Sequence, residues 1–342
     1  MKTTNDFHQR LAHIRAWLWI LLLPLAFLWG LGAAIRSRGE RKRGNFFSRK
    51  TVICYGNIQA GGSGKTPLAL QTVHELVESS SALILRGYRG KIKSSEELDR
   101  TRSNGAELYG DEAWMVAQVT RARIWVGPKR VKSLSAIDSQ EGIQWIVCDD
   151  GVQDPSFHKD VVVCAVSGDG RPDGHFLIPL GDGRDHFSRL GKSDAAIVTA
   201  ATKPDHWLEF CKNNFPELPV FWAKREVQGF FEGEKPHLRP IGPVFAFSGV
   251  GNPDSFLATL RSVVPVSGYH SFRNHHFYSK RDAIRVLDVA KALSVTHIVT
   301  TDKDWSKVHS LFADSPMSLL TLRMSYVLDE SYLVWLKGRV LA

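Results

Sequence analysis

Short apolar runs alternate with amphipathic stretches along most of this chain. In the first clear example, the apolar run Val52–Tyr55 leads into a glycine-rich turn, and an amphipathic pattern from Leu68 to Val77 follows. Apolar runs of this length are typical of buried strands, and apolar residues spaced three or four apart are typical of helices. The sequence therefore predicts a strand, a turn and a helix in succession between residues 51 and 78.

The same alternation continues to the C-terminus and predicts an α/β fold with a mostly parallel sheet and helices on both faces. Further buried strands are expected at 82–85, 124–126, 144–148, 161–166 and 195–199, with helices at 111–119 and 130–137. A turn at 230–236 reads as part of a connecting ribbon. A second, smaller unit then follows, with strands at 244–247, 298–300 and 319–322 and helices beginning at 253 and 279.

These patterns divide the chain into three expected regions. Residues 1–44 form an N-terminal anchor with a basic flank, residues 45–225 a domain built around the glycine-rich turn, and residues 226–342 a β-ribbon linker with a C-terminal α/β domain. A chain of 342 residues is long enough for two domains with cores of their own.

The turn after the first strand has the composition of a phosphate-binding loop. Backbone N–H groups of such a loop point at phosphate oxygens, a lysine reaches the terminal phosphates and a hydroxyl contacts Mg²⁺. The residues expected to bind nucleotide are Gly61, Gly62, Ser63, Gly64, Lys65 and Thr66. Gln59 occupies the place where the usual signature has glycine, so a plain glycine-rich turn before an ordinary helix is the alternative.

Acidic residues follow the ends of other predicted strands. The strand at 144–148 ends in Asp149 and Asp150, and an acid at that place in such a sheet holds Mg²⁺ opposite the loop hydroxyl. An ordinary Asp-Gly turn is the alternative. Lys65, Asp111, Asp149 and Asp150 all follow strands, and ligands of parallel sheets gather at the carboxyl ends of strands. We therefore expect one common site.

The N-terminal region predicts attachment to a membrane. Residues 1–50 hold ten Lys or Arg and two acids, which accounts for +8 of the net charge of +9. Charge concentrated in this way favours anionic lipid over nucleic acid. Ala16–Ile35 carries no charge and, as a helix, would measure about 30 Å, the thickness of one hydrocarbon core. A transmembrane helix and a half-inserted anchor bent at Pro24 both fit, whereas a signal peptide fits poorly.

The order of basic residues places the folded body in the cytoplasm, because most of them follow the apolar segment. The four cysteines form no CxxC pair, so neither disulfides nor a zinc site is expected. His275 and His276 are adjacent. One of them is a candidate catalytic residue, and the other a packed core residue.

Seven short motifs together resemble one family. They are, in order, GNIQAGGSGKTP, RGYRG, GDEAW, DDGVQD, AFSGVGNPDSF, HHFYS and TTDKDWSKV. In this set the chain resembles the tetraacyldisaccharide 4′-kinases of lipid A biosynthesis, from the N-terminal anchor almost to the end. The resemblance implies transfer of the γ-phosphate of ATP, with Mg²⁺, to the 4′-hydroxyl of a tetraacyldisaccharide 1-phosphate. It also implies two α/β/α domains joined by a β ribbon, at the cytoplasmic face of a Gram-negative inner membrane.

The resemblance also implies a role for individual residues. Lys65 and Thr66 serve nucleotide and metal, Asp149 and Asp150 serve the metal, Asp111 resembles the catalytic base, and His275 resembles the histidine that works with it. The positions matching contacts to phosphate or the glycolipid headgroup are Asn57, Tyr88, Arg130, Gln153 and Arg184. Beyond the glycolipid and anionic lipids no obligate protein partner is evident.

The chain departs from the family pattern at three places near these residues. Asp154 stands where the family has His, Asp185 where it has Glu, and Asn274 where it has an acid. The rival class is a membrane-tethered ATPase or GTPase switch without lipid kinase activity. A GTPase would need an Asn-Lys-x-Asp motif, which the sequence lacks, and a dimerising ATPase of the deviant type would need a lysine near Ala60.

Overall fold

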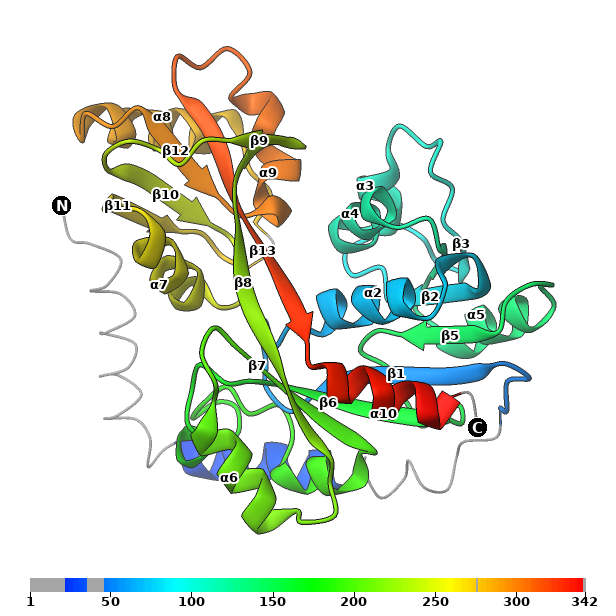
Figure 1. Ribbon diagram of the computed structural model, residues 1–342. Coiled ribbons are helices and arrows are strands. Elements are labelled where there is room, and N and C mark those ends of the chain that lie inside the picture. The colour runs from blue at the N-terminus through cyan, green and yellow to red at the C-terminus, as the bar shows by residue number, and fades with distance from the viewer. Residues whose placement is uncertain (1–21, 36–45, 275, 341–342) are drawn as a thin grey trace. The chain divides into compact units, whose positions relative to one another are not determined.

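A computed structural model describes residues 22–35, 46–274 and 276–340 (Figure 1). The described chain divides into two compact units. Residues 22–225 and 326–340 make the N-terminal unit, and residues 226–325 make the C-terminal unit. Strands β8 (Val220–Glu232) and β13 (Ser318–Leu328) each run from one unit into the other.

The N-terminal unit is built on a mostly parallel sheet. Its strands are β1 (Thr51–Asn57), β2 (Ser81–Leu85), β3 (Glu96–Glu97), β4 (Arg123–Val126), β5 (Trp145–Cys148), β6 (Val161–Ser167), β7 (Ala195–Ala200) and the first part of β8. They lie in the order β8-β7-β6-β1-β5-β2-β4-β3, and only the β3–β4 pair is antiparallel. The predicted α/β class with a mostly parallel sheet is therefore confirmed.

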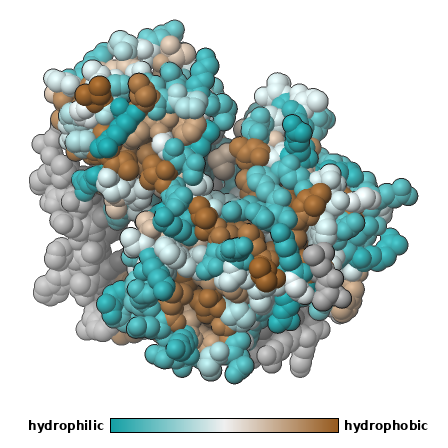
Figure 2. Space-filling model, in the orientation of Figure 1, coloured by the Kyte–Doolittle hydropathy of each residue, from teal (hydrophilic) through white to brown (hydrophobic). Residues whose placement is uncertain are grey.

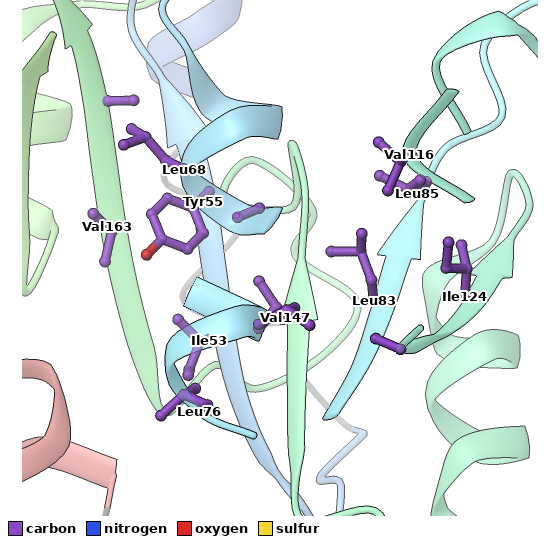
Figure 3. Close-up of a cluster of buried hydrophobic side chains, with 14 of the residues drawn as sticks. Ile53, Tyr55, Leu68, Leu76, Leu83, Leu85, Val116, Ile124, Val147 and Val163 are labelled. Atoms are coloured by element: carbon purple, nitrogen blue, oxygen red, sulfur yellow. The ribbon is translucent and has the colours of Figure 1, made fainter. Parts of the chain in front are cut away.

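Helices cover both faces of this sheet because its strands are apolar on both sides. The helices are α2 (Lys65–Glu75), α3 (Gly105–Tyr109), α4 (Asp111–Val119), α5 (Arg130–Asp138), α6 (Asp205–Asn214) and α10 (Glu330–Val340), with 3₁₀ turns at Glu78–Ser80, Pro172–Gly174 and Phe187–Lys192. Figure 3 shows one core cluster, in which Leu68 of α2 and Leu76, directly after α2, pack with Ile53 and Tyr55 of β1. Leu134 and Ile137 of α5 belong to a separate cluster with Val52.

The C-terminal unit has its own parallel strands and core. The elements are β9 (Lys235–His237), β10 (Val244–Ser248), β11 (Val266–Ser271), β12 (His297–Thr300), α7 (Pro253–Val263), α8 (Lys280–Ala292), α9 (Asp302–Val308), a 3₁₀ turn at His309–Leu311 and most of β13. The parallel pairs are β10–β11, β10–β12 and β12–β13. As predicted, Ser279 caps α8: its hydroxyl accepts from Asp282 N, and the Asp282 carboxylate binds back in a capping box.

Residues 326–340 return to the N-terminal unit, which differs from the predicted grouping of residues 226–342 with the C-terminal domain. The physical reason is burial: Tyr332 and Leu336 of α10 belong to the core cluster that contains Tyr55. The hydroxyl groups of Tyr332 and Tyr55 also form a hydrogen bond. No local pattern reveals a contact between residues 277 positions apart.

The predicted membrane helix is described only in part. Residues 22–35 are helical, and the beginning of Ala16–Ile35 lies outside the described residues. No described helix is both long and apolar enough to meet the requirements of a membrane span. Several apolar side chains of this helix are nevertheless exposed, including Phe27, Leu28 and Ile35. Elsewhere, hydrophilic residues cover much of the face shown in Figure 2, interrupted by smaller hydrophobic areas.

Candidate active site

The glycine-rich loop connects the carboxyl end of β1 to α2, as predicted. Gly64 precedes the first residue of α2 with φ of 77°, a left-handed conformation that favours glycine. The off-pattern residue Gln59 is buried, and its side-chain oxygen accepts a 2.7 Å hydrogen bond from Ser167 N at the end of β6. The glutamine thus fixes the start of the loop to the sheet at the position where the signature has glycine.

Thr66 meets two carboxylates on neighbouring elements. Its hydroxyl lies 2.7 Å from Asp149 Oδ2, just after β5, and 2.7 Å from Glu112 Oε1 in the first turn of α4. Asp149 is buried, and its other oxygen, Oδ1, has no hydrogen-bond partner among the described residues. Burial, and next the negative charge of Glu112, raise the pKa of Asp149 to about 7.

Asp150 faces the cations of the site. Its Oδ1 lies 3.6 Å from Lys65 Nζ and 2.8 Å from Arg184 Nη1. Burial alone would raise the pKa of Asp150, but the positive charges of Lys65 and Arg184 outweigh it and hold this pKa below its usual value. Asp150 has φ of 51°, which Asp tolerates better than most residues, and adjacent acids thereby reach different partners.

Arg130 supports the Asp149-Asp150 turn through the backbone. Its Nη2 donates to Asp150 O at 2.7 Å and to Asp149 O at 3.2 Å, and the side chain is buried. Asp154 lies 3.5 Å from Arg130 Nη1 and forms an ion pair with it. The departure at position 154 therefore supplies a negative charge for the arginine that holds the turn.

Asn57 and Gln153 link the end of β1 to the loop after β5. Gln153 Nε2 donates to Asn57 O at 2.9 Å, and Asn57 Oδ1 lies 3.4 Å from Arg184 Nη1. Asp185, the second departure, is buried and pairs with Arg189 Nε at 2.8 Å within its own segment. Asn57, Gln153 and Arg184 are therefore in the same contact network as Asp150.

Asp111 is the first residue of α4, and Gly110 is its N-cap residue. Gly110 has φ of 89°, and a Cβ there would lie 2.5 Å from Tyr88 O, so the backbones of the RGYRG and GDEAW segments touch. Tyr88 itself is half exposed. The contact places the loop that carries Tyr88 beside the start of α4, where Asp111 lies, and Glu112 connects α4 directly to Thr66.

Of the two adjacent histidines, the structure describes His276. His275 lies outside the described residues. His276 Nε2 lies 3.2 Å from Asp282 Oδ2, and its ring stacks on Phe272 with centroids 4.7 Å apart. His276 is therefore held by an acid partner and by stacking on an aromatic ring.

The structure thus brings Lys65, Thr66, Asp149, Asp150, Arg184, Arg130, Asn57 and Gln153 into one network in the N-terminal unit. Sequence reasoning missed Glu112. The signal was present, because Glu112 follows Asp111 in the first turn of a predicted helix, where acids are favoured by the helix dipole. That preference applies to any acid at the start of a helix, so it does not predict the contact of Glu112 with Thr66.

A strand–loop–helix with Lys65 and Thr66, faced by acids that follow the neighbouring strand β5, has the arrangement typical of a phosphate-binding loop. Comparison with known proteins gives the family: a model described as tetraacyldisaccharide-1-P 4′-kinase matches residues 18–340, and the chain belongs to this family.

Relatives agree with this assignment. The chain is 32% identical over 299 residues to a tetraacyldisaccharide 4′-kinase of Parvibaculum lavamentivorans, covering 84% of this chain and 81% of that one. It is 30% identical to the enzyme of the same name from Maricaulis maris, covering 84% and 82%. The fold resembles that of LpxK from Aquifex aeolicus, solved in complex with ATP, with a TM-score of 0.70 at 21% identity over 96% of this chain and all of that one.

Proposed function

We propose that this chain, as a member of its family, transfers the γ-phosphate of ATP to the 4′-hydroxyl of a tetraacyldisaccharide 1-phosphate in lipid A biosynthesis. The observation that carries the proposal is the meeting of Lys65, Thr66, Asp149 and Asp150 at the carboxyl ends of β1 and β5. Phosphoryl transfer is catalysed mainly by positioning and charge neutralisation, and this site offers both. Lys65 and Arg184, now paired with Asp150, are the cations available to phosphate oxygens.

The residues present fit Mg²⁺ in the form that accompanies a nucleotide. Mg²⁺ is held by one or two carboxylates, waters and substrate phosphates. Thr66 Oγ1 is an oxygen ligand of the right kind, and so is Oδ1 of buried Asp149, to which no described residue hydrogen-bonds. Glu112 adjoins them. Bound Mg²⁺ would supply charge neutralisation to the phosphates. Asp150 reaches the cations and not Thr66 here, so Asp149 is the stronger candidate ligand of the pair.

Asp111 is the proposed catalytic base. Its place beside Glu112 brings it within one residue of the Thr66 contact, and a carboxylate near the γ-phosphate removes the proton of the sugar hydroxyl. His275 is proposed to assist it. Tyr88 and Arg184 are proposed to contact the glycolipid headgroup. For Arg130, Asn57 and Gln153, the backbone contacts favour a role in holding the loops that contact it.

The helix at 22–35 is proposed to attach the enzyme to the cytoplasmic face of the inner membrane. Ala26 is buried, Trp29 Nε1 donates to Arg184 O at 3.1 Å, and Phe27 is 71% exposed. The helix therefore contacts the segment that carries Arg184 while its apolar side chains stay available to lipid.

We expect a variant lacking residues 1–35 to lose most of its flotation with liposomes that contain anionic lipid. The basic residues that follow would leave weaker, salt-sensitive binding, at about 1 kcal/mol per basic side chain near the surface. Flotation of both proteins at low and high salt measures this. Salt-independent binding of the shortened protein would contradict the assignment of the anchor.

The function is tested with the purified full chain, labelled ATP, Mg²⁺ and the lipid disaccharide in mixed micelles. The expected product is the 4′-phosphorylated lipid, and a disaccharide without a free 4′-hydroxyl is the matched control. ATP hydrolysis without a phosphorylated lipid would overturn the proposal in favour of an ATPase switch.

A further inference from the structure

The phosphate-binding loop lies against an aromatic side chain from the far end of the chain. A Cβ built on Gly64 would lie 2.9 Å from Cζ and 3.1 Å from Oη of Tyr326, so the phenol ring packs directly on the loop backbone. Tyr326 belongs to β13 and is more than 250 positions from the loop in sequence. Gly64 is the N-cap residue of α2 and comes immediately before Lys65.

Tyr326 is in turn held by Arg225. The Arg225 guanidinium hydrogen-bonds the Tyr326 side chain and also forms a two-pronged pair with Asp169, with Nη1–Oδ2 at 2.8 Å and Nη2–Oδ1 at 2.9 Å. Asp169 lies in the loop after β6. A paired arginine fork of this kind fixes orientation as well as charge. Asp169, Arg225, Tyr326 and Gly64 therefore form a continuous row of contacts, which we call the Tyr326 brace.

The Tyr326 brace includes both residues at which the chain crosses between the two units. Arg225 is the last residue of the N-terminal unit before β8 enters the C-terminal unit, and Tyr326 is the first residue after β13 returns. The two points at which the chain crosses between the units are thus bonded to each other and packed on the nucleotide loop. Neither residue belongs to a motif noted in the sequence.

We propose that Tyr326 and Arg225 are positioning residues that set the conformation of the Gly64-Lys65 turn and couple nucleotide binding to the two strand crossings. The inference rests on the proposed function in one respect, that the loop binds ATP. Packing by Tyr326 keeps Lys65 in register with the phosphates. A nucleotide that shifts the loop moves the ring, the ring moves Arg225, and the crossings transmit the change to the C-terminal unit.

Two substitutions of Tyr326 separate its two contacts. Tyr326→Phe keeps the ring on Gly64 and removes the hydroxyl that Arg225 binds. Tyr326→Ala removes both. We expect Tyr326→Ala to weaken ATP binding about tenfold to a hundredfold, because small displacements in a binding site have effects of that size. Tyr326→Phe should bind ATP within about threefold of wild type, since the ring remains.

ATP affinity is measured by calorimetry on the full chain with Mg²⁺ and without lipid. The control is Val327→Ala, the next position on the same strand, whose side chain is half exposed. Thermal unfolding is followed for each variant. If Tyr326→Ala binds ATP as tightly as wild type, the positioning role is overturned. If Tyr326→Ala does not fold, Tyr326→Leu decides the same question, because it keeps an apolar side chain at this position and removes the ring that contacts Gly64.

Coupling is measured as a nucleotide-dependent distance between two labels, one in each unit. Glu209→Cys on α6 and Ser262→Cys on α7 are exposed sites for labelling, and the native cysteines are buried. In the otherwise wild-type chain, saturating ATP should change the distance distribution. In Tyr326→Phe and Arg225→Gln backgrounds the change should fall by at least half, with ATP still bound. An unchanged response in both backgrounds, or no response in the parent, overturns the coupling.

These outcomes are distinct from those for the proposed function. A protein that binds ATP, shows the coupling and fails to phosphorylate the lipid would remove the kinase proposal and leave the Tyr326 brace in place. A protein that phosphorylates the lipid and shows no effect of either substitution would do the reverse. Failure of the parent chain to bind ATP would overturn both.

Discussion

Both units place an acid beside a threonine hydroxyl at the carboxyl ends of parallel strands, but the surrounding charges differ. In the N-terminal unit, Asp149 shares the hydroxyl of Thr66 with Glu112, and the pKa of Asp149 is raised to about 7 by burial and by Glu112. The neighbouring Asp150 is paired with Lys65 and Arg184. Charges of both signs therefore stand close together, and one buried acid is held under repulsion.

In the C-terminal unit the corresponding acid is bound by neutral donors. Asp304 is fully buried, and its Oδ2 accepts from Gly249 N at 2.8 Å and from the Thr301 hydroxyl at 2.8 Å. Gly249 follows β10 and Thr301 follows β12, so the carboxylate ties two strand ends together. Thr301 also caps α9 by accepting from Asp304 N.

The difference indicates opposite uses of the same place in a parallel sheet. Neutral donors aimed at one carboxylate stabilise the folded unit. Two acids beside one hydroxyl, with cations nearby, are unfavourable until a cation or a phosphate joins them, as expected for a site built for ligands. Substitutions around Asp149 and Asp150 should therefore change catalysis, and substitutions around Asp304 should change stability.

The largest effect is expected from Lys65→Ala. Removing the cation that reaches the terminal phosphates should lower kcat/KM for lipid phosphorylation by about 10³-fold, because the charge acts on the transition state. The free energy of unfolding should change little. Steady-state kinetics with urea unfolding checks both, and near-wild-type turnover would remove Lys65 from the site.

Asp111→Asn should have the next largest effect. Loss of a general base lowers kcat by about 10²-fold or more, while ATP affinity stays unchanged because the group acts on the acceptor hydroxyl. The asparagine keeps the size of the side chain at the start of α4. Weaker ATP binding with normal kcat would instead assign Asp111 a structural role.

The raised pKa of Asp149 predicts a pH-dependent affinity for Mg²⁺. A ligand must lose its proton to bind metal, so Mg²⁺–ATP binding should strengthen as pH rises towards about 7 and level off above it. Below that value each pH unit should weaken binding by up to about tenfold. Calorimetry with Mg²⁺ at a series of pH values on both sides of 7 measures this.

Two variants sharpen that pH experiment. Glu112→Gln removes the repelling charge, so the pKa of Asp149 should fall and the levelling should begin at lower pH. Asp149→Asn has no carboxyl group to titrate and keeps only the pH dependence of the nucleotide itself. A wild-type profile identical to that of Asp149→Asn would show that Asp149 does not bind the metal.

The contrast also explains what the sequence could predict. Helix α4 has the predicted bounds Asp111–Val119, and Ser279 caps α8, because periodicity and capping are local signals. Strand β11 was missed because Gly268 and polar residues interrupt its apolar pattern. β13 was predicted to stop at Leu322 but continues to Leu328 through half-exposed residues. Extended chain without an apolar face gives little periodic signal.

For the site, the sequence located the residues but not their partners. Asp149 and Asp150 are adjacent, and their order in the sequence does not reveal that Asp149 faces Thr66 while Asp150, with a positive φ, faces Lys65. The contact of Tyr326 with Gly64 joins distant parts of the chain and has no local pattern. The roles assigned to Asp111 and His275 stay predictions.

The smallest effect on catalysis and the clearest effect on stability are expected from substitutions around Asp304. Asp304→Ala leaves Gly249 N and the Thr301 hydroxyl without an acceptor in a buried place, which should cost about 1–3 kcal/mol of the free energy of unfolding. ATP affinity should stay at the wild-type value. Urea unfolding and calorimetry measure the two quantities.

Tyr278→Phe is the matched control for Asp304→Ala. Burial, and next the negative charge of Asp304, raise the pKa of Tyr278 well above its usual value, so its hydroxyl stays protonated. That hydroxyl and Asp304 Oδ1 are both buried without a hydrogen-bond partner among the described residues. Removing it should therefore change the free energy of unfolding by less than about 1 kcal/mol. A loss as large as that of Asp304→Ala would mean that Tyr278 donates to the carboxylate in solution, and the group of neutral donors around Asp304 would then include a third member.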